Sequence, residues 1–299
     1  MQVANWRVEA VAARADVLGE GPYWCSASRR LWWLDVMDNE LCSFDPVSGA
    51  SSVIRTEHKV HALARCAFPW FICTVHVHGL AWLNVQTGQL LALRDPENAK
   101  PTMLLNDARC DSAGRFWFGS MHKKGAPEGS LYSLDGEMNL KAHHHGVGTA
   151  NGMAFSPDGR WLYFIDTYYG ILRFAVEAPG DRLGPPIVLV DAKLLQGWPD
   201  GMTIDSDGCL WVALAHGGAV LRVTPEGKVD AILGVPARFV TSCTFGGEDL
   251  ATLFVTTATL GRSPEELAAY PQSGALFAID TGYQGLAETP FRATPPATV

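Results

Sequence analysis

Short apolar stretches separated by polar turns recur along the whole chain. The clearest copy is Asn151–Gly170, in which one polar residue precedes a short apolar stretch, a turn at Ser156–Gly159 and a second apolar stretch, Trp161–Ile165. Pro157 presets φ at the second turn position, and Gly159 tolerates a positive φ at the fourth. This stretch therefore predicts a β-hairpin with a polar residue at its entrance.

The same hairpin pattern occurs six times. The residues that head the six first strands are Glu20, His61, Asn106, Asn151, Asp200 and Thr241, which lie 41 to 49 residues apart. This period is typical of propeller blades and is longer than that of leucine-rich or ankyrin repeats. A third strand, and usually a fourth, follows each hairpin, and helical periodicity is nearly absent except for one turn at Ser263–Ala269. We predict an all-β protein, a single six-bladed β-propeller domain over residues 1–299 with four antiparallel strands per blade.

Three stretches between the hairpins complete the expected architecture. A closed ring must join its ends, so the strand near Trp6–Ala12 is expected to complete the last blade. The Gly- and Pro-rich stretch Ala178–Pro186 predicts a long loop. His143–His145 has the composition of a metal-binding tract, but its place before the next strand favours a solvated loop.

Charge and composition exclude several kinds of partner. The net charge is −8, and no run of Lys or Arg is longer than Lys123-Lys124, so we expect no nucleic acid and no anionic membrane surface as partner. The most apolar region, His61–Val85, is broken by Arg65 and Pro69 and does not predict a membrane span. The start of the chain has no apolar core of signal-peptide length, so a cytoplasmic location is expected. The seven Cys, with no CxxC pair, indicate small buried apolar side chains rather than disulfides or a zinc site.

The predicted geometry places a site at one mouth of the central channel. First strands line the channel of a propeller, so the residues that head them should meet there. Glu20, Asn106, Asn151 and Asp200 would form an oxygen-rich cluster suited to a hard divalent cation. Without a cation, the two carboxylates would repel each other in a partly buried place. The alternative is that polar residues merely hydrate the channel mouth.

Turns that follow second strands open on the same face as this cluster. They bring His122, Lys123, Lys124, Tyr168, Tyr169 and His216 to the rim. Tyr168, Tyr169 and Trp198 are candidate walls for a ring-shaped ligand, although aromatic residues near propeller turns often serve only in packing. We expect His122, Lys123, Lys124, Tyr168 and His216 to contact a small molecule bound at this mouth.

Four motifs carry a resemblance to a known family. LGEGPYW, NDARCDSAGRFWFGSMH, ANGMAFSPDGRWLYFIDTYYG and PDGMTIDSDGCLWVAL, in this order, resemble the gluconolactonase, regucalcin and senescence-marker family of six-bladed propellers. The resemblance covers nearly the whole chain. It implies a hydrolase of sugar lactones in which Glu20, Asn151 and Asp200 hold one divalent cation and Asp200 is the general base. It also implies that Asn106 lies beside the cation and contacts the substrate or completes the metal shell.

Two departures from the family pattern concern the substrate. Leu104 stands where the family often has an Arg that contacts substrate, and His122-Lys123-Lys124 stands where an acidic residue is common. We expect a five- or six-carbon aldonolactone, and an anionic lactone that carries a sulfonate or carboxylate is the alternative.

The expected chemistry leaves the base and the metal open. The cation would polarise the lactone carbonyl and stabilise the oxyanion as a Lewis acid. A carboxylate bound to the cation is a poor base, so water activated by the cation, or His216, is an alternative to Asp200. The sequence does not choose between calcium, zinc, manganese and iron(II). Other functions that fit such a site are a phosphotriesterase or aryl-esterase and a non-catalytic metal-binding propeller.

Overall fold

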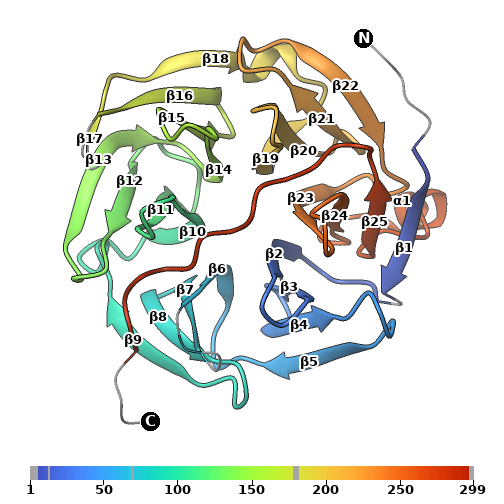
Figure 1. The fold of residues 1–299 in the computed structure, drawn as a ribbon, viewed down its shortest axis with the longest axis horizontal. Helices are drawn as coiled ribbons and strands as arrows, with labels where there is room; N and C mark the ends of the chain where they lie inside the picture. Colours follow the sequence, from blue (N-terminus) through green and yellow to red (C-terminus); the bar gives the residue numbers. More distant parts are fainter. Residues whose placement is uncertain (1–5, 13, 67, 69–70, 178–181, 296–299) are drawn as a thin grey trace.

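Six β-sheets surround a central channel in the computed structural model, which describes residues 6–12, 14–66, 68, 71–177 and 182–295. Each sheet is one blade, and the blades follow one another around the ring in chain order (Figure 1). The chain is thus a six-bladed β-propeller, and the fold prediction is confirmed.

Strands run from the channel outward in each blade. The innermost strands of blades one to six are β2 (Gly19–Cys25), β6 (Val60–Arg65), β10 (Met103–Cys110), β14 (Ala150–Phe155), β19 (Trp198–Ile204) and β23 (Val240–Gly246). The second strands are β3 (Arg30–Asp35), β7 (Phe71–His76), β11 (Phe116–His122), β15 (Trp161–Asp166), β20 (Leu210–Ala215) and β24 (Thr252–Thr257). The third strands are β4 (Glu40–Phe44), β8 (Gly79–Asn84), β12 (Gly129–Leu134), β16 (Gly170–Glu177), β21 (Ala219–Val223) and β25 (Leu276–Asp280). The outer strands are β5 (Ser51–Arg55), β9 (Leu90–Arg94), β13 (Leu140–Val147), β18 (Ile187–Asp191), β22 (Val229–Gly234) and β1 (Val8–Ala12).

The ring closes through its N-terminal strand. β1 pairs antiparallel with β25 and so completes blade six, as predicted (Figure 1). The predicted helical turn is also confirmed as α1 (Pro264–Ala269), which Ser263 and Glu266 cap through a reciprocal pair of hydrogen bonds. A short 3₁₀ helix, η1 (Ala192–Leu194), follows β18.

Two predicted loops are wrong in part or in whole. Within the expected loop Ala178–Pro186, residues 178–181 lie outside the described residues, and β17 (Arg182–Leu183) pairs with β16. His143–His145 lie within β13 instead of a solvated loop. The His143 ring is 4.4 Å from the Trp117 ring, and the His144 ring is 5.3 Å from that of Phe174. The rings of His143 and His144 pack on aromatic side chains, and this packing favours the strand. The composition of the His tract does not reveal these contacts.

Buried tryptophans anchor three blades. Trp33, Trp117 and Trp211 lie on second strands and are fully buried. Each indole N–H donates to a buried Asp, at 2.7 Å to Asp16, 2.9 Å to Asp111 and 2.9 Å to Asp205. A buried indole needs such a partner because an unpaired N–H costs free energy. The seven Cys are buried and form no disulfide with one another.

The C-terminal segment crosses one end of the channel (Figure 1). Residues 282–293, which we name the strap, accept a hydrogen bond from Ser206 N at Gln284 O (2.8 Å) and donate one from Arg292 N to Gly114 O (3.0 Å). Ser206 and Gly114 belong to turns between first and second strands, on the face away from the predicted site. Phe291 of the strap is fully buried. The strap therefore covers the channel on that face. No helix in the described parts of the chain has the length and apolar character needed to cross a membrane.

Candidate metal and active site

A β-bulge interrupts each innermost strand where the predicted site residue lies. Register shifts fall at Glu20/Tyr23, Val60/Ala62, Leu105/Ala108, Asn151/Met153, Pro199/Met202 and Val240/Ser242. A bulge bends its strand and changes the direction of a side chain. The repeated bulge explains how strands that supply apolar side chains to the blades also present polar residues near the channel axis.

Glycines next to the metal-ligand candidates allow the bulges of neighbouring blades to approach closely. A Cβ on Gly201 would lie 2.0 Å from Ser242 Oγ, and one on Gly152 would lie 2.8 Å from the Asp200 carbonyl oxygen. Gly21, after Glu20, has a φ of +54°, which few other residues adopt without strain. Blades four, five and six are thus closely packed at the bulges near the beginnings of β14 and β19, where Asn151 and Asp200 lie.

A chain of hydrogen bonds fixes the two carboxamides. Thr167 Oγ1 donates to the Pro199 carbonyl at 2.9 Å and accepts from Asn151 Nδ2 at 2.8 Å. Asn151 Oδ1 in turn accepts from Asn106 Nδ2 at 2.8 Å. Asn106 Nδ2 also donates to the Ala150 carbonyl at 2.8 Å. The structure therefore brings Asn106 and Asn151 into direct contact and fixes the orientation of both amides.

Three carboxylates crowd near the axis. Burial raises the pKa of Glu20 well above its ordinary value, and the charges of Asp200 and Asp107 raise it further. Burial and the charge of Asp107 likewise raise the pKa of Asp200. Glu20 accepts a hydrogen bond from Gly21 N at 3.2 Å, which offsets only part of this cost. Crowded acids of this kind need protons or a cation to neutralise them.

The oxygen donors fit a divalent cation. Carboxylate and amide oxygens are the usual ligands of calcium and related hard cations. No three His, Cys, Asp or Glu side chains of the described chain stand in the arrangement of a preformed metal site. The predicted set instead combines the carboxylates of Glu20 and Asp200 with the amide of Asn151. Binding there would offset the mutual repulsion of the acids.

A small cavity lies beside these groups. Its volume is about 40 Å³, and it is lined by Leu18, Glu20, Val36, His61, Asn106, Asp107 and Asn151. This volume is enough for an ion or one or two ordered water molecules. A sugar ring is larger, so a substrate would have to bind at the mouth with only its reacting part close to the carboxylates.

Two exposed aromatic side chains lie at the same ends of blades four and five as Asn151 and Asp200. Tyr168 and Trp198 are 57% and 56% exposed. Gly125 of the neighbouring blade lies so close to Tyr168 that a Cβ there would be 2.7 Å from the phenol oxygen. The Trp198 ring is 4.6 Å from that of His216. The predicted contributions of Tyr168 and His216 to the rim are thus compatible with their positions.

His216 is partly enclosed by its neighbours. Its ring is 4.9 Å from the Phe239 ring, and its Nδ1 is 3.3 Å from Arg262 Nη1. Burial lowers the pKa of His216, and the charges of Arg262 and Arg238 lower it further. The imidazole is therefore neutral near pH 7, which suits a hydrogen-bonding role.

The basic turn of blade three is held by its own backbone. Lys123 Nζ donates to the Pro101 carbonyl at 2.7 Å. His122 Nδ1 accepts from the backbone N–H of Lys124 at 3.1 Å. Any contact of Lys123 with a substrate would have to replace or share this hydrogen bond.

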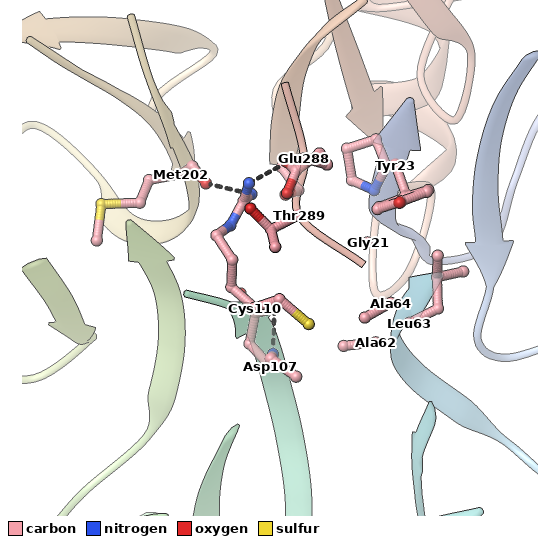
Figure 2. Close-up of a pocket in the computed structure, with 14 residues that line it drawn as sticks. Gly21, Tyr23, Ala62, Leu63, Ala64, Asp107, Cys110, Met202, Glu288 and Thr289 are labelled. Atoms are coloured by element: carbon pink, nitrogen blue, oxygen red, sulfur yellow. Dashed lines mark hydrogen bonds and ion pairs between the residues drawn. The ribbon is translucent and has the colours of Figure 1, made fainter. Parts of the chain in front are cut away.

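Two parts of the site were not predicted from the sequence. Asp107 follows Asn106 within the same bulge, and its acidic side chain was the signal that could have found it. Arg109 forms an ion pair with Glu288 of the strap and donates to the Met202 carbonyl at 3.0 Å. A second cavity lies between the innermost strands and the strap, and its lining includes Asp107, Cys110, Glu288 and Thr289. Figure 2 shows Asp107 and Cys110 on one side of this cavity and Glu288 and Thr289 of the strap across from them. Nothing in the apolar pattern of the strap indicates that it enters the channel.

Comparisons with known proteins agree with this architecture. Residues 18–259 match the family described as the SMP-30/gluconolactonase/LRE-like region. The chain is 34% identical to a 6-deoxy-6-sulfogluconolactonase of Pseudomonas putida, over 96% of this chain and 99% of the relative. It is 31% identical to regucalcin of Oryctolagus cuniculus, over 93% and 95% of the two chains. A calcium-binding protein, regucalcin from Agrobacterium tumefaciens, superposes with a TM-score of 0.90 at 28% identity, with 96% and 98% covered.

The family match spans most of the chain, and the matched residues include the innermost strands of all six blades. The chain belongs to the SMP-30/gluconolactonase/LRE-like family.

Proposed function

We propose that this protein is a metal-dependent hydrolase that opens a sugar lactone to the corresponding acid. One observation carries the proposal: the acids Glu20, Asp107 and Asp200 crowd at the axis, and burial and mutual repulsion raise the pKa values of Glu20 and Asp200. A bound divalent cation would offset the repulsion between these carboxylates, so the site favours cation binding. The lactonase name of a 34% identical relative supports the reaction.

Glu20, Asn151 and Asp200 are the proposed ligands of one divalent cation. When bound, the cation would supply Lewis acidity to the lactone carbonyl and to the oxyanion that develops on it. Asn151 is suited to this role because Thr167 holds its amide nitrogen and leaves Oδ1 on the axial side. The calcium-binding description of the superposed regucalcin makes calcium the first ion to test.

The chain itself supplies orientation and proton acceptance. Asn106 is in contact with Asn151 and lines the small cavity, so it is placed to hold the reacting end of the substrate. Asp200 is the proposed base that takes the proton of the attacking water. Because ligation of a cation lowers the basicity of a carboxylate, water activated by the cation and His216 are the alternatives to Asp200 as base.

The rim would recognise the rest of the sugar. Tyr168 offers an exposed aromatic face beside the turn that carries His122, Lys123 and Lys124. His216 and Trp198 form the other part of this wall. The preferred substrate is a neutral five- or six-carbon aldonolactone, because Lys123 already has a carbonyl partner.

An anionic lactone is the second candidate. It is favoured by the sulfogluconolactonase name of the Pseudomonas putida relative and by the Lys pair on the rim. If Lys123 and Lys124 bind an anionic group, Lys123→Ala and Lys124→Ala should raise KM for a sulfonated lactone, with an effect that shrinks as salt rises. If the lysines only line the rim, both variants should match the parent on neutral and charged lactones alike.

A substrate panel tests the reaction class. Hydrolysis of neutral lactones, sulfonated lactones, aryl esters and phosphotriesters would be followed in a pH-stat, before and after chelator, together with elemental analysis of the protein. We expect lactone hydrolysis that chelator abolishes and a divalent cation restores. Turnover of phosphotriesters or aryl esters without lactones would assign another hydrolase class. Metal binding with no turnover of any ester would indicate a binding propeller.

A further inference from the structure

His61 heads the innermost strand of blade two, and its imidazole lines the small axial cavity beside Glu20. Its Nδ1 lies 3.2 Å from Asn106 Oδ1. The role of this nitrogen follows from the hydrogen bonds on the other side of Asn106.

Two backbone carbonyls fix the direction of every hydrogen bond in this chain of side chains. Thr167 must donate to the Pro199 carbonyl, so its oxygen accepts from Asn151 Nδ2. Asn106 Nδ2 uses its hydrogens on the Ala150 carbonyl and on Asn151 Oδ1. Asn106 Oδ1 is an acceptor only, and the Nδ1 of His61 must therefore carry the hydrogen.

The other ring nitrogen is then an acceptor without a partner. A neutral imidazole that carries its hydrogen on Nδ1 presents a lone pair at Nε2. His61 Nε2 is buried and has no hydrogen-bond partner among the described residues. Burial lowers the pKa of His61, and the charge of Lys59 lowers it further, which keeps this lone pair free. A buried acceptor without a donor is costly, so it marks a place for a ligand or water.

The residues that line the cavity indicate which molecule can donate a hydrogen bond to His61 Nε2. Apart from two apolar side chains, the polar groups around it include His61 Nε2 and the carboxylates of Glu20 and Asp107, which accept hydrogen bonds when ionised. An occupant that satisfies both His61 Nε2 and an ionised carboxylate donates two hydrogen bonds and fits into about 40 Å³. Water has two hydrogens and fits this volume, whereas a substrate hydroxyl has only one.

We propose that His61 Nε2 accepts a hydrogen bond from the water that attacks the substrate carbonyl and thereby orients this water beside the proposed metal ligands. The attack of this water on a substrate rests on the proposed lactonase function. The position of the water does not depend on that function. It adds a residue from blade two to a site otherwise built from blades one, three, four and five.

Two substitutions separate the acceptor from the contact with Asn106. His61→Asn retains an N–H near the position of Nδ1 and removes the acceptor at Nε2. His61→Gln places an amide near the position of Nε2, whose oxygen can accept, and removes the Nδ1 donor. We expect His61→Asn to lower kcat by about tenfold to a hundredfold with little change in KM, and His61→Gln to retain more activity than His61→Asn. Metal content and Tm should stay close to those of the parent.

Other outcomes of the same comparison would overturn the proposal. A parent-like His61→Asn with a strongly impaired His61→Gln would mean that His61 only supports Asn106. Loss of metal from His61→Asn would make His61 a metal ligand. A loss of activity on gluconolactone that is absent for δ-valerolactone, which has no hydroxyl groups, would mean that His61 binds a substrate hydroxyl.

Two measurements on the chelated protein are independent of turnover. Long-range ¹⁵N–¹H NMR near pH 7 should show the hydrogen of His61 on Nδ1, and a high-resolution crystal structure should show a water about 3 Å from Nε2. A hydrogen on Nε2, or an empty cavity, would refute the assignment of this water. A parent protein that hydrolyses no lactone while meeting both expectations would instead refute only the proposed reaction.

Discussion

Glu20 and Asp200 are costly residues in the metal-free protein, since each is a partly buried acid near other acids. In the proposed site the same position would be useful, because the attraction of a bound cation for the carboxylates would offset their mutual repulsion. At the scale of single residues, stability and function therefore oppose each other at the axis of the propeller.

Removal of either proposed ligand charge should separate these two effects. We expect Glu20→Gln and Asp200→Asn each to lower lactone turnover by at least about a hundredfold and to weaken metal retention, as loss of a metal ligand commonly does. The Tm of the chelated variants should equal or exceed that of the chelated parent, because a repulsive charge has gone. Thermal unfolding with and without calcium, with elemental analysis, measures both. Full metal content with near-normal turnover would show that the ligand assignment is wrong.

The stability of the chelated protein should also depend on pH. The folded-state pKa values of Glu20 and Asp200 lie above their ordinary values of 4.5 and 3.8, so the folded state keeps protons that the unfolded chain has released. Their contribution is fully present below pH 3.8 and is lost as pH rises through the raised pKa values. As pH rises from these ordinary values through the raised pKa values, we expect the free energy of unfolding to fall in the chelated parent and to fall less in Glu20→Gln. Urea titrations across this range provide the test, and equal slopes would contradict the assignment.

Asn106 provides a contrast within the same cluster. Asn106→Ala removes the contact with Asn151 but no proposed ligand and no charge. We expect turnover to fall more than metal affinity, as measured by steady-state kinetics at saturating metal and by metal titration. Equal losses in both would place Asn106 among the metal ligands.

Single residues were predictable where a repeated position carried the signal. Glu20, Asn106, Asn151 and Asp200 stood out because the hairpin repeat aligns them. Asp107 lies one position after the aligned residue Asn106, and no other copy of the repeat has an acid there. The repeat therefore did not identify Asp107 as a site residue. The tautomer of His61 depends on hydrogen bonds that pass through blades three, four and five, and no local pattern encodes it.

The β-bulges are the elements that convert a regular blade into a site. Gly152 and Gly201 lie in the bulges next to Asn151 and Asp200, and neither has room for a Cβ beside the neighbouring blade. The strands themselves were predicted well because the alternation of apolar and polar residues follows burial. The bulges were not, since one extra residue near the end of a strand leaves no distinct apolar pattern.

A methyl group at Gly201 should therefore disturb the site through the backbone. It would meet Ser242 Oγ at 2.0 Å, and we expect Gly201→Ala to destabilise the protein by about 1–3 kcal/mol and to weaken metal binding. Gly234→Ala is the matched control, because its Cβ would meet nothing within 4 Å. Chemical denaturation and calcium titration of both variants test this. Similar behaviour of the two variants would argue against close packing of the bulges as the element that positions Asp200.

The strap and β1 connect blades that are distant in the sequence and so stabilise the ring as a whole. β1 closes blade six by pairing with β25, and this was predictable because any closed ring needs such a strand. The strap was not predictable, since residues 282–293 contain one short apolar cluster and no repeat. Its place became visible only from contacts with blades that are distant in sequence, such as the hydrogen bond from Phe291 N to Arg65 O at 2.7 Å.

The buried side chain of the strap offers a test of this role. The Phe291 ring lies 5.7 Å from the rings of both Trp82 and Phe116, so it joins blades two and three on the face opposite to the proposed metal site. We expect Phe291→Ala to destabilise the protein by about 3–5 kcal/mol and to lower Tm by roughly 10 °C. Leu286→Ala is the control on the same segment, because Leu286 is 37% exposed and should change Tm by only a few degrees. Calcium affinity and turnover at 25 °C should stay close to those of the parent in both variants, since neither residue touches the axial acids. Loss of metal binding in Phe291→Ala while the protein remains folded would show that the strap also shapes the site, through Glu288 and Arg109.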